Sequence, residues 1–251
     1  MSTLIAKLDE VSVSFGERVV LKDLSLDIVE GAITCIIGLS GAGKSTILRL
    51  LNGLRKPDRG HSYVRGTDIC HMPESELIDF RVAIGFAFQF AALFDSMTIG
   101  DNVALPLREH TKMSPQEIDE TVKATLDSVG LSNTEANYPS ELSGGMLKRA
   151  GFARAVVTNP KLVLYDEPTT GLDPIITHVL TDTIKRLRAQ LKATAVVVSH
   201  DLQSIYMMAD YVAMLFEGAI IAYGTVEEVR SSVNPIVQQF LQGSEVGPIP
   251  L

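Results

Sequence analysis

One stretch of nine residues constrains the fold of this chain more than any other: Gly38-Leu39-Ser40-Gly41-Ala42-Gly43-Lys44-Ser45-Thr46. It fits the pattern G-x-x-x-x-G-K-[ST], a glycine-rich loop that cradles phosphate. The apolar run 33–37 before it predicts a buried strand, and the run 46–51 after it predicts a helix. Glycines let successive N–H groups turn toward one anion, and the helix adds its positive N-terminal end. The stretch therefore predicts a nucleotide-binding α/β fold.

Two side chains of this loop predict its chemistry. Lys44 would reach the β- and γ-phosphates of a bound nucleotide, and the hydroxyl of Ser45 would hold Mg²⁺. The alternative is a glycine-rich turn that precedes Lys-Ser by chance. The strand before the loop and the helix after it favour the phosphate site.

The bulk composition excludes several classes of protein. The 251 residues include 22 Lys and Arg against 30 Asp and Glu, a net charge of −8 without a basic run, so we expect no nucleic-acid partner. The two cysteines, Cys35 and Cys70, lack metal-ligand spacing. The longest apolar run, 82–94, is interrupted by Gln89 and is too short to span a membrane. These features predict a soluble chain in a reducing cytosol.

Apolar runs along the chain predict the sheet. Residues 4–28 show the alternation of β-strands, and a short strand is expected through Tyr63 and Val64. Near-continuous apolar runs at 84–88, 162–165 and 195–198, with a helix from Pro174 to about Leu191, predict parallel strands buried on both faces.

Between these strands, residues 90–157 predict a helical insert. A helix that starts at Thr98 is expected to be short because it meets Pro106. The next helix has a strong start, with Ser114 as cap, Pro115 in the first turn and Glu117 closing a capping box.

Polar residues follow the buried strands, at the carboxyl ends where α/β sheets bind ligands. Asp166 is expected to face Mg²⁺, Glu167 to polarise an attacking water, and His200 to bond the γ-phosphate and orient that water. A solvated turn is the alternative for Asp166-Glu167. The remaining histidines show no ligand spacing and are expected to be surface groups: His61, His71, His110 and His178.

Three further features are candidates for nucleotide contacts. The amide of Gln89, after strand 84–88, is placed to reach a metal-bound water and the γ-phosphate. Ser143-Gly144-Gly145 begins a helix and offers a second anion site, whose economical use is to grip the phosphate bound to another copy of the chain. Phe15 would stack on an adenine ring. The alternatives are a surface glutamine, a capped helix that binds nothing, and a core phenylalanine.

In this order, these motifs resemble the nucleotide-binding subunit of ABC transporters over nearly the whole chain. The resemblance implies an ATP- and Mg²⁺-dependent ATPase whose homodimer sandwiches two ATP molecules head to tail. It makes Phe15 the adenine-stacking residue, Gln89 the Q-loop glutamine and 143–145 the signature motif that acts in trans. Asp166 becomes the Walker B aspartate and Glu167 the catalytic base. The resemblance also makes Asp173 the D-loop residue and His200 the switch histidine. Met146 departs from the usual glutamine, and Phe15 from a common tyrosine.

The resemblance also implies the domain plan. We expect one ABC ATPase domain over residues 1–251, with a RecA-like parallel core and an antiparallel β subdomain in 1–89 and 158–224. The helical subdomain is expected at 90–157 and a short helical tail at 225–251.

Four segments carry a narrower resemblance: 88–97, 102–110, 142–146 and 239–243. They are similar to the ATPases of Mla, or MCE-type, systems, which move phospholipids between the inner and outer membranes of Gram-negative bacteria. That resemblance implies a membrane permease, a periplasmic MCE-domain subunit and a small cytoplasmic STAS-domain subunit. It also implies a peripheral position on the cytoplasmic face of the inner membrane.

Two other functions stay open on the sequence. One is the ATPase of a small-solute importer such as a methionine transporter, and the other is a soluble ABC ATPase of translation or DNA repair. The apolar run Phe90–Phe94 has two interpretations as well: part of the core, or the lining of a groove that receives a permease helix.

Overall fold

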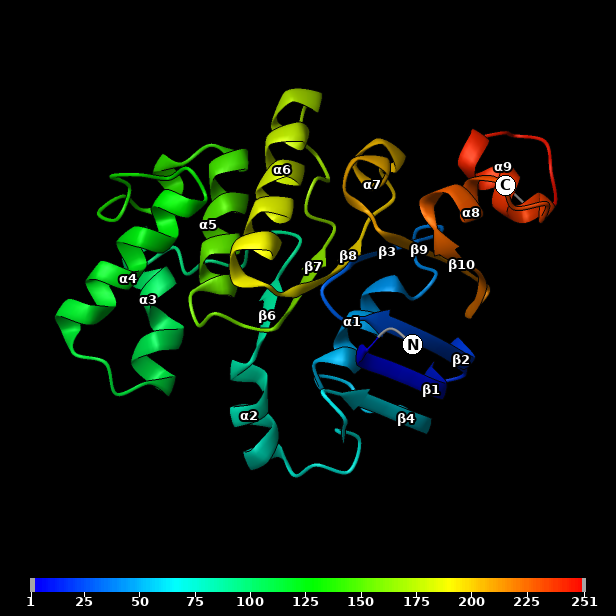
Figure 1. Cartoon of the computed structure of the whole chain (residues 1–251), viewed down its shortest axis with the longest axis horizontal. Coiled ribbons are helices and arrows are strands. Elements are labelled where there is room, and N and C mark those ends of the chain that lie inside the picture. Colours follow the sequence, from blue (N-terminus) through cyan, green and yellow to red (C-terminus); the bar gives the residue numbers. More distant parts are fainter. Residues whose placement is uncertain (1–2, 250–251) are drawn as a thin grey trace. The chain divides into compact units, whose positions relative to one another are not determined.

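A computed structural model describes residues 3–249, which belong to two compact units (Figure 1). The first unit comprises Met1–Met72 with Val196–Leu251, and the second comprises Pro73–Ala195. Within residues 3–249, every helix is too short or too polar to cross a bilayer.

The first unit contains an antiparallel sheet of strand order β2-β1-β4-β5. Its strands are β1 (Leu4–Phe15), β2 (Arg18–Val29), β4 (Arg59–Val64) and β5 (Thr67–Asp68). The alternation at 4–28 predicts strands, and these are confirmed as β1 and β2, which pair in a long antiparallel hairpin beside β4 (Figure 1). The short strand expected through Tyr63 and Val64 is confirmed as β4.

A second set of strands in this unit carries the phosphate loop. Strand β3 (Ile33–Ile37) is buried throughout and pairs in parallel with β9 (Tyr211–Phe216), which pairs antiparallel with β10 (Ala219–Thr225). Helix α1 (Lys44–Leu51) follows the loop, so the predicted strand–loop–helix is confirmed. Strand β8 (Thr194–Val198) crosses into this unit at Val196.

Three short helices complete the first unit: α7 (Leu202–Met208), α8 (Val226–Arg230) and α9 (Pro235–Gln242). The chain after α9 folds back on that helix. The buried Gln239 accepts a hydrogen bond from the N–H of Ile249 at 2.7 Å and donates one to the carbonyl of Ser244 at 3.2 Å.

The second unit is built around two parallel strands, β6 (Ile84–Ala87) and β7 (Leu162–Asp166). Helix α2 (Glu74–Val82) precedes β6, helix α5 (Gly144–Val156) precedes β7, and helix α6 (Pro174–Leu191) follows it, with the bounds that the sequence predicts for α6. The fully buried Tyr165 of β7 meets Phe152 of α5 edge to face, with ring centroids 5.1 Å apart. This contact fixes α5 against the strand that ends at Asp166.

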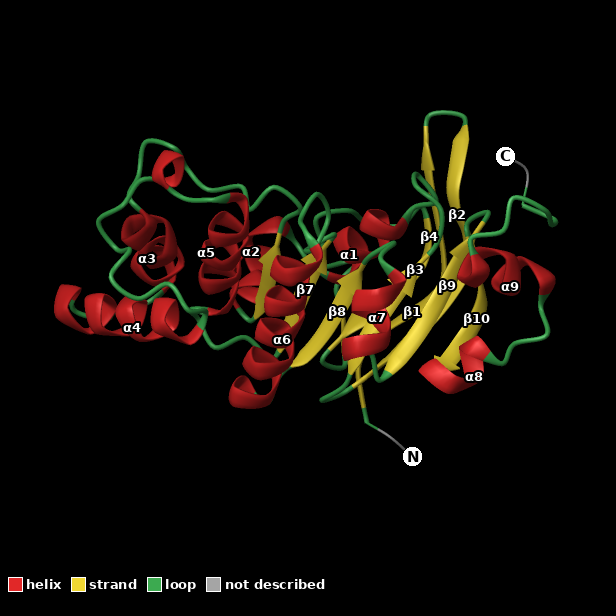
Figure 2. Cartoon of the chain, turned by 90° about the horizontal axis from the view of Figure 1, so that it is seen from above, coloured by secondary structure: helices red, strands yellow, loops and turns green. Residues whose placement is uncertain are grey.

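Helices α3 (Ile99–His110) and α4 (Pro115–Ser128) pack beside α5 (Figure 2). The expectation of a helix cut short at Pro106 is wrong, because α3 continues to His110 with Pro106 inside it. A proline removes only one helical hydrogen bond, and burial of Val103, Ala104 and Leu107 on one face outweighs that loss.

The capping box of α4 is confirmed, which allows a test of its contribution to stability. The N–H of Glu117 donates to Ser114 Oγ at 3.3 Å, and the N–H of Ser114 donates to Glu117 Oε2 at 2.7 Å. Ser114→Ala should lower the free energy of unfolding by about 1 kcal/mol in urea titrations. The control is Ser128→Ala at the other end of α4, whose hydroxyl donates only locally to the Thr125 carbonyl. Equal losses in the two variants would contradict the capping role.

Candidate nucleotide site

The phosphate loop has two positions, Gly38 and Gly43, whose backbone conformation and close neighbours allow only glycine. Gly38 has φ +146°, and a Cβ there would lie 2.3 Å from the carbonyl oxygen of Leu215. Gly43 has φ +108°, and its Cβ would lie 2.8 Å from Val20 Cγ1. Any side chain at either position would push the loop away from β9 or β2. The close approach of these strands therefore shapes the cradle.

Lys44 is held inside the loop. Its ammonium donates to the carbonyls of Gly38 at 2.9 Å and Leu39 at 3.0 Å, and the residue is buried. The N–H groups of Thr46 and Ile47 both donate to the carbonyl of Gly43 as α1 begins. The loop thus holds a positive charge in place at the N-terminal end of a helix, an arrangement suited to phosphate.

His200 lies in the same unit as this loop and lines a cavity with it. The cavity, of about 460 Å³, is bounded by Gly38–Ser40, by His200 and Leu202, and by residues 240–243 at the end of α9. His200 itself is exposed and comes just after β8, whose exit is fixed by the Ser199 N–H donating to the Ile36 carbonyl. His200 therefore lies beside the start of the phosphate loop.

Phe15 is not a core residue. It ends β1 with 48% of its surface exposed, and the guanidinium of Arg55 lies 5.2 Å from its ring centroid. An exposed aromatic ring with a cation near it offers a flat apolar face for a base. The exposure excludes the alternative of a buried phenylalanine.

In the second unit, Asp166 ends β7 and Glu167 follows in a left-handed conformation, with φ +47°. Thr170 donates its hydroxyl to Glu167 Oε2 at 2.9 Å, so the carboxylate of Glu167 is oriented by the turn that follows it. Strained φ values of this kind cost energy and concentrate at functional sites.

The signature segment 143–145 begins α5 as predicted. Ser143 caps the helix by accepting a hydrogen bond from the N–H of Met146 at 3.4 Å. A Cβ on Gly145 would lie 2.6 Å from Ile176 Cγ2, so glycine is needed where α5 meets the start of α6. Asp173 caps α6 by accepting from the N–H groups of Ile175 and Ile176. Two capped helix starts therefore lie side by side.

Lys148 is a residue that the sequence analysis missed. Its ammonium is buried and donates to the backbone carbonyl of Gln89 at 2.5 Å and to that of Glu167 at 3.2 Å. Burial lowers the pKa of Lys148, and the carboxylates of Glu167 and Asp166 oppose this shift. One side chain of α5 thus joins the glutamine after β6 to the glutamate after β7. A basic residue on the buried face of α5 was the only signal in the sequence.

The segment after Gln89 is fastened to the helices at two places. Arg154 of α5 donates to the carbonyls of Ala91 and Ala92, both at 2.7 Å, and these alanines adopt positive φ. The fully buried Asn102 of α3 binds both backbone groups of Phe94.

This fastening leaves aromatic side chains in solvent. Phe90 is 85% exposed and Phe94 is 52% exposed, whereas Ala91 between them is buried. The interpretation of Phe90–Phe94 as core is therefore wrong for its two phenylalanines. They form an exposed apolar patch next to Gln89.

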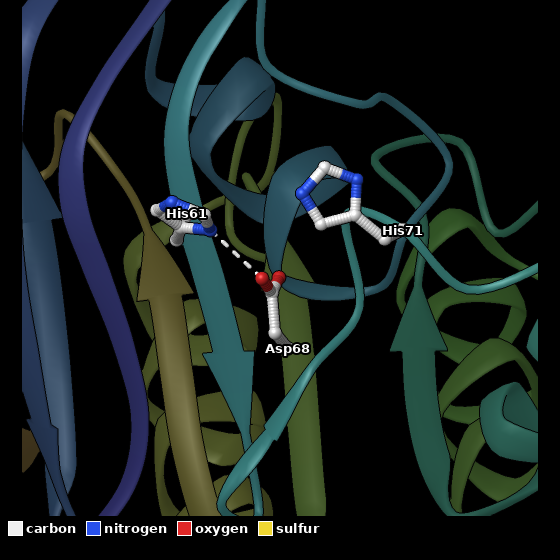
Figure 3. A group of neighbouring side chains, drawn as sticks. All are labelled: His61, Asp68 and His71. Atoms are coloured by element: carbon white, nitrogen blue, oxygen red, sulfur yellow. Dashed lines mark hydrogen bonds and ion pairs between the residues drawn. The ribbon is translucent and has the colours of Figure 1, made fainter.

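His61 and His71, which show no ligand spacing in the sequence, come together in the structure. Both approach Asp68 in the first unit (Figure 3). The strand pairing of β4 with β5 brings these positions together, and ligand spacing along the sequence does not show it.

The predicted site residues thus fall into two groups. Phe15, the phosphate loop 38–46 and His200 belong to the first unit. The second unit carries the others, namely Gln89, Ser143, Gly144, Gly145, Asp166, Glu167 and Asp173.

Comparison with known proteins supplies the family. The family described as ABC transporter matches residues 21–170. The intermembrane phospholipid transport system ATP-binding protein MlaF of Haemophilus influenzae is 43% identical over 93% of this chain and 89% of its own length. Its Escherichia coli K12 counterpart is 42% identical over 96% of this chain and 90% of its own length. A probable ribonucleotide transport ATP-binding protein, mkl of Mycobacterium leprae, is 43% identical over 94% of this chain and 68% of its own length.

Solved structures agree with the sequence matches. The dimeric ATP-binding cassette MJ0796, in a post-hydrolysis state with ADP and Pi, superposes with a TM-score of 0.81 and 32% identity. The match covers 88% of this chain and 98% of that one. The family match, the near full-length relatives and the cassette fold agree: this chain belongs to the ABC transporter family, as an ATP-hydrolysing, ATP-binding subunit.

Proposed function

We propose that this chain is the ATPase of a transporter that moves phospholipid between the inner and outer membranes. The observation that carries the proposal is the similarity to MlaF proteins, which extends over about nine tenths of both chains. Its partners would be a membrane permease, a periplasmic MCE-domain subunit and a small STAS-domain subunit. The chain would lie on the cytoplasmic face of the inner membrane.

The residues of the phosphate loop fit a nucleotide. Gly38 and Gly43 lie where a Cβ would collide with neighbouring strands, and the buried Lys44 already places its charge inside the loop. We assign ATP to residues 38–46, with its adenine on the exposed ring of Phe15. The hydroxyl of Ser45, the amide oxygen of Gln89 and the carboxylate of Asp166 are hard oxygen donors of the kind Mg²⁺ prefers. Bound there, Mg²⁺ would neutralise charge on the β- and γ-phosphates.

Hydrolysis would use three side chains of this protein. Glu167, oriented by Thr170, would accept a proton from the water that attacks the γ-phosphate. His200 would donate a hydrogen bond to the γ-phosphate and hold that water in line. Lys44 would stabilise the charge that develops on the transferred oxygens.

A homodimer would complete each site. The start of α5 carries the N–H groups of Gly144 and Gly145, which one ATP, already cradled by a phosphate loop, does not need. Ser143, Gly144 and Gly145, with Asp173 beside them, would instead act in trans on the ATP held by the other copy.

The second unit offers a route from ATP to the permease. Lys148 joins Gln89 to Glu167, and Arg154 and Asn102 fasten the segment that exposes Phe90 and Phe94. A shift at Gln89 would therefore move this apolar patch, which is suited to an apolar helix of the permease.

The transported molecule can be tested by purification from the native organism. The tagged chain should bring down a permease, an MCE-domain subunit and phospholipid from mildly solubilised membranes, identified by mass spectrometry. The mkl relatives make ribonucleotide transport the second candidate, since their identity to this chain equals that of MlaF. A permease with a soluble solute-binding protein, or recovery free of membranes, would contradict the phospholipid assignment.

Glu167→Gln should bind ATP yet turn it over at least about 100-fold more slowly, because the base that takes the proton is lost. ATP would then trap the closed dimer, seen as a doubled mass in size-exclusion chromatography with light scattering. Lys44→Ala is the matched control and should stay monomeric, since its phosphate loop has lost the charge. Monomeric Glu167→Gln at saturating ATP and Mg²⁺, with the permease present, would refute the assignment.

Lys148→Met should lower kcat by about 10- to 100-fold while the KM for ATP stays near the wild-type value. The methionine keeps the apolar length of the side chain but releases the carbonyls of Gln89 and Glu167. Lys123→Met, on the exposed face of α4, is the control and should leave both constants unchanged. If the KM for ATP rises as kcat falls, the role of Lys148 is merely structural. The same conclusion follows if Lys148→Arg restores the thermal stability but not kcat.

A further inference from the structure

Three side chains of the first unit gather at one end of the β4–β5 hairpin: His61, Asp68 and His71 (Figure 3). One nitrogen or oxygen of each lies within 4.8 Å of the other two. His61 Nδ1 and Asp68 Oδ2 are already in contact at 2.7 Å. Among residues 3–249, this is the one group of three or more His, Cys, Asp or Glu side chains with such an arrangement.

The hairpin register explains why these residues meet. Val64 pairs with Thr67 and Tyr63 with Asp68, and the Ile69 N–H donates to the Ser62 carbonyl. The turn residues Arg65 and Gly66 both have positive φ, as a two-residue hairpin turn requires. Ser62 and Val64 are buried, so His61 and Tyr63 share the opposite face with Asp68. His61 and Asp68 are therefore diagonal neighbours across two strands.

The backbone around the group orients its ligands. Asp68 Oδ1 accepts a hydrogen bond from the Cys70 N–H at 3.0 Å, which turns Oδ2 toward His61. Just beyond His71, the carbonyl of Met72 accepts a hydrogen bond from Lys56 at 3.0 Å. The contact with Cys70 thus holds Asp68 in a binding orientation before an ion arrives.

We propose that His61, Asp68 and His71 bind a divalent transition-metal ion, with Zn²⁺ as the expected occupant. Two imidazoles and one carboxylate match the ligands of zinc, whereas Mg²⁺ and Ca²⁺ require oxygen ligands throughout. Three protein ligands leave a fourth position for water. This site is separate from the Mg²⁺ that accompanies ATP.

The geometry needs only a small adjustment to accept the ion. Ligand atoms around tetrahedral zinc lie about 3.3 Å apart, given bonds of about 2.0 Å. The His61–Asp68 pair would open slightly from 2.7 Å, and His71 would move inward. His71 is exposed and lies in a loop, and its ring already lies edge-on to that of His61, with centroids 5.9 Å apart.

Zinc at this position would cross-link β4 to the chain that follows β5. The ion would bind the folded hairpin and not the unfolded chain, so it should raise the thermal unfolding midpoint. At concentrations above Kd, this rise should grow with the logarithm of the free zinc concentration. Zinc thus becomes a structural ligand of the β sheet that also contains Phe15.

The test uses the full chain, freed of metal by a chelator and kept without nucleotide. Titration with Co²⁺ should produce the visible absorption of a tetrahedral site at one equivalent, and Zn²⁺ should abolish that absorption. His61→Ala and His71→Ala should each weaken binding at least 10-fold. His178→Ala is the matched control, since His178 pairs with Asp182 at 3.5 Å without a third ligand in the group.

Thermal unfolding separates binding from folding. Zn²⁺ should raise the midpoint of the wild type and of His178→Ala, and leave that of His71→Ala unchanged. Because His71 is exposed, His71→Ala should fold like the wild type in the absence of metal. Binding that fails to saturate at one equivalent would overturn the proposal, as would equal binding by His71→Ala and the wild type. If His61 and Asp68 only form a hydrogen bond and hold no ion, His71→Ala and the wild type should behave alike toward Zn²⁺.

Discussion

Each unit of this protein depends on a buried lysine whose ammonium is held by two backbone carbonyls. In the first unit, Lys44 binds the carbonyls of Gly38 and Leu39; in the second, Lys148 binds those of Gln89 and Glu167. A buried ammonium must find such acceptors, because the cost of removing it from water is large. Each lysine thereby ties together the backbone segments whose carbonyls it binds.

These two lysines differ in what they hold. Lys44 fixes one short loop, the phosphate loop, through the carbonyls of Gly38 and Leu39. Lys148 joins two segments that follow different strands, β6 and β7, and its own helix α5 begins with the signature segment. Gln89, expected to sense the γ-phosphate, and Glu167, expected to activate water, are therefore bound by the same side chain. Movement of either should be transmitted to α5 and to the exposed Phe90 beyond it.

Much of this could be predicted from sequence, because local rules decided it. The phosphate loop follows from its glycines, and the start of α4 from Ser114 and Glu117, in both cases without tertiary information. The prediction of a short helix ending near Pro106 was wrong, because burial of one helix face outweighed the lost hydrogen bond. The sequence was silent on Lys148 and on the approach of His61 to His71. Those depend on which strands become neighbours, and a single sequence does not encode that in any local pattern.

In this protein the nucleotide state would reach the segment 88–98 through Lys148. Hydrogen–deuterium exchange of that segment in Glu167→Gln, with and without ATP and Mg²⁺, measures this coupling. We expect ATP to slow exchange there, and adding Lys148→Met to remove this response while the phosphate loop 38–46 still becomes protected. An equal ATP response in 88–98 with and without Lys148 would contradict it.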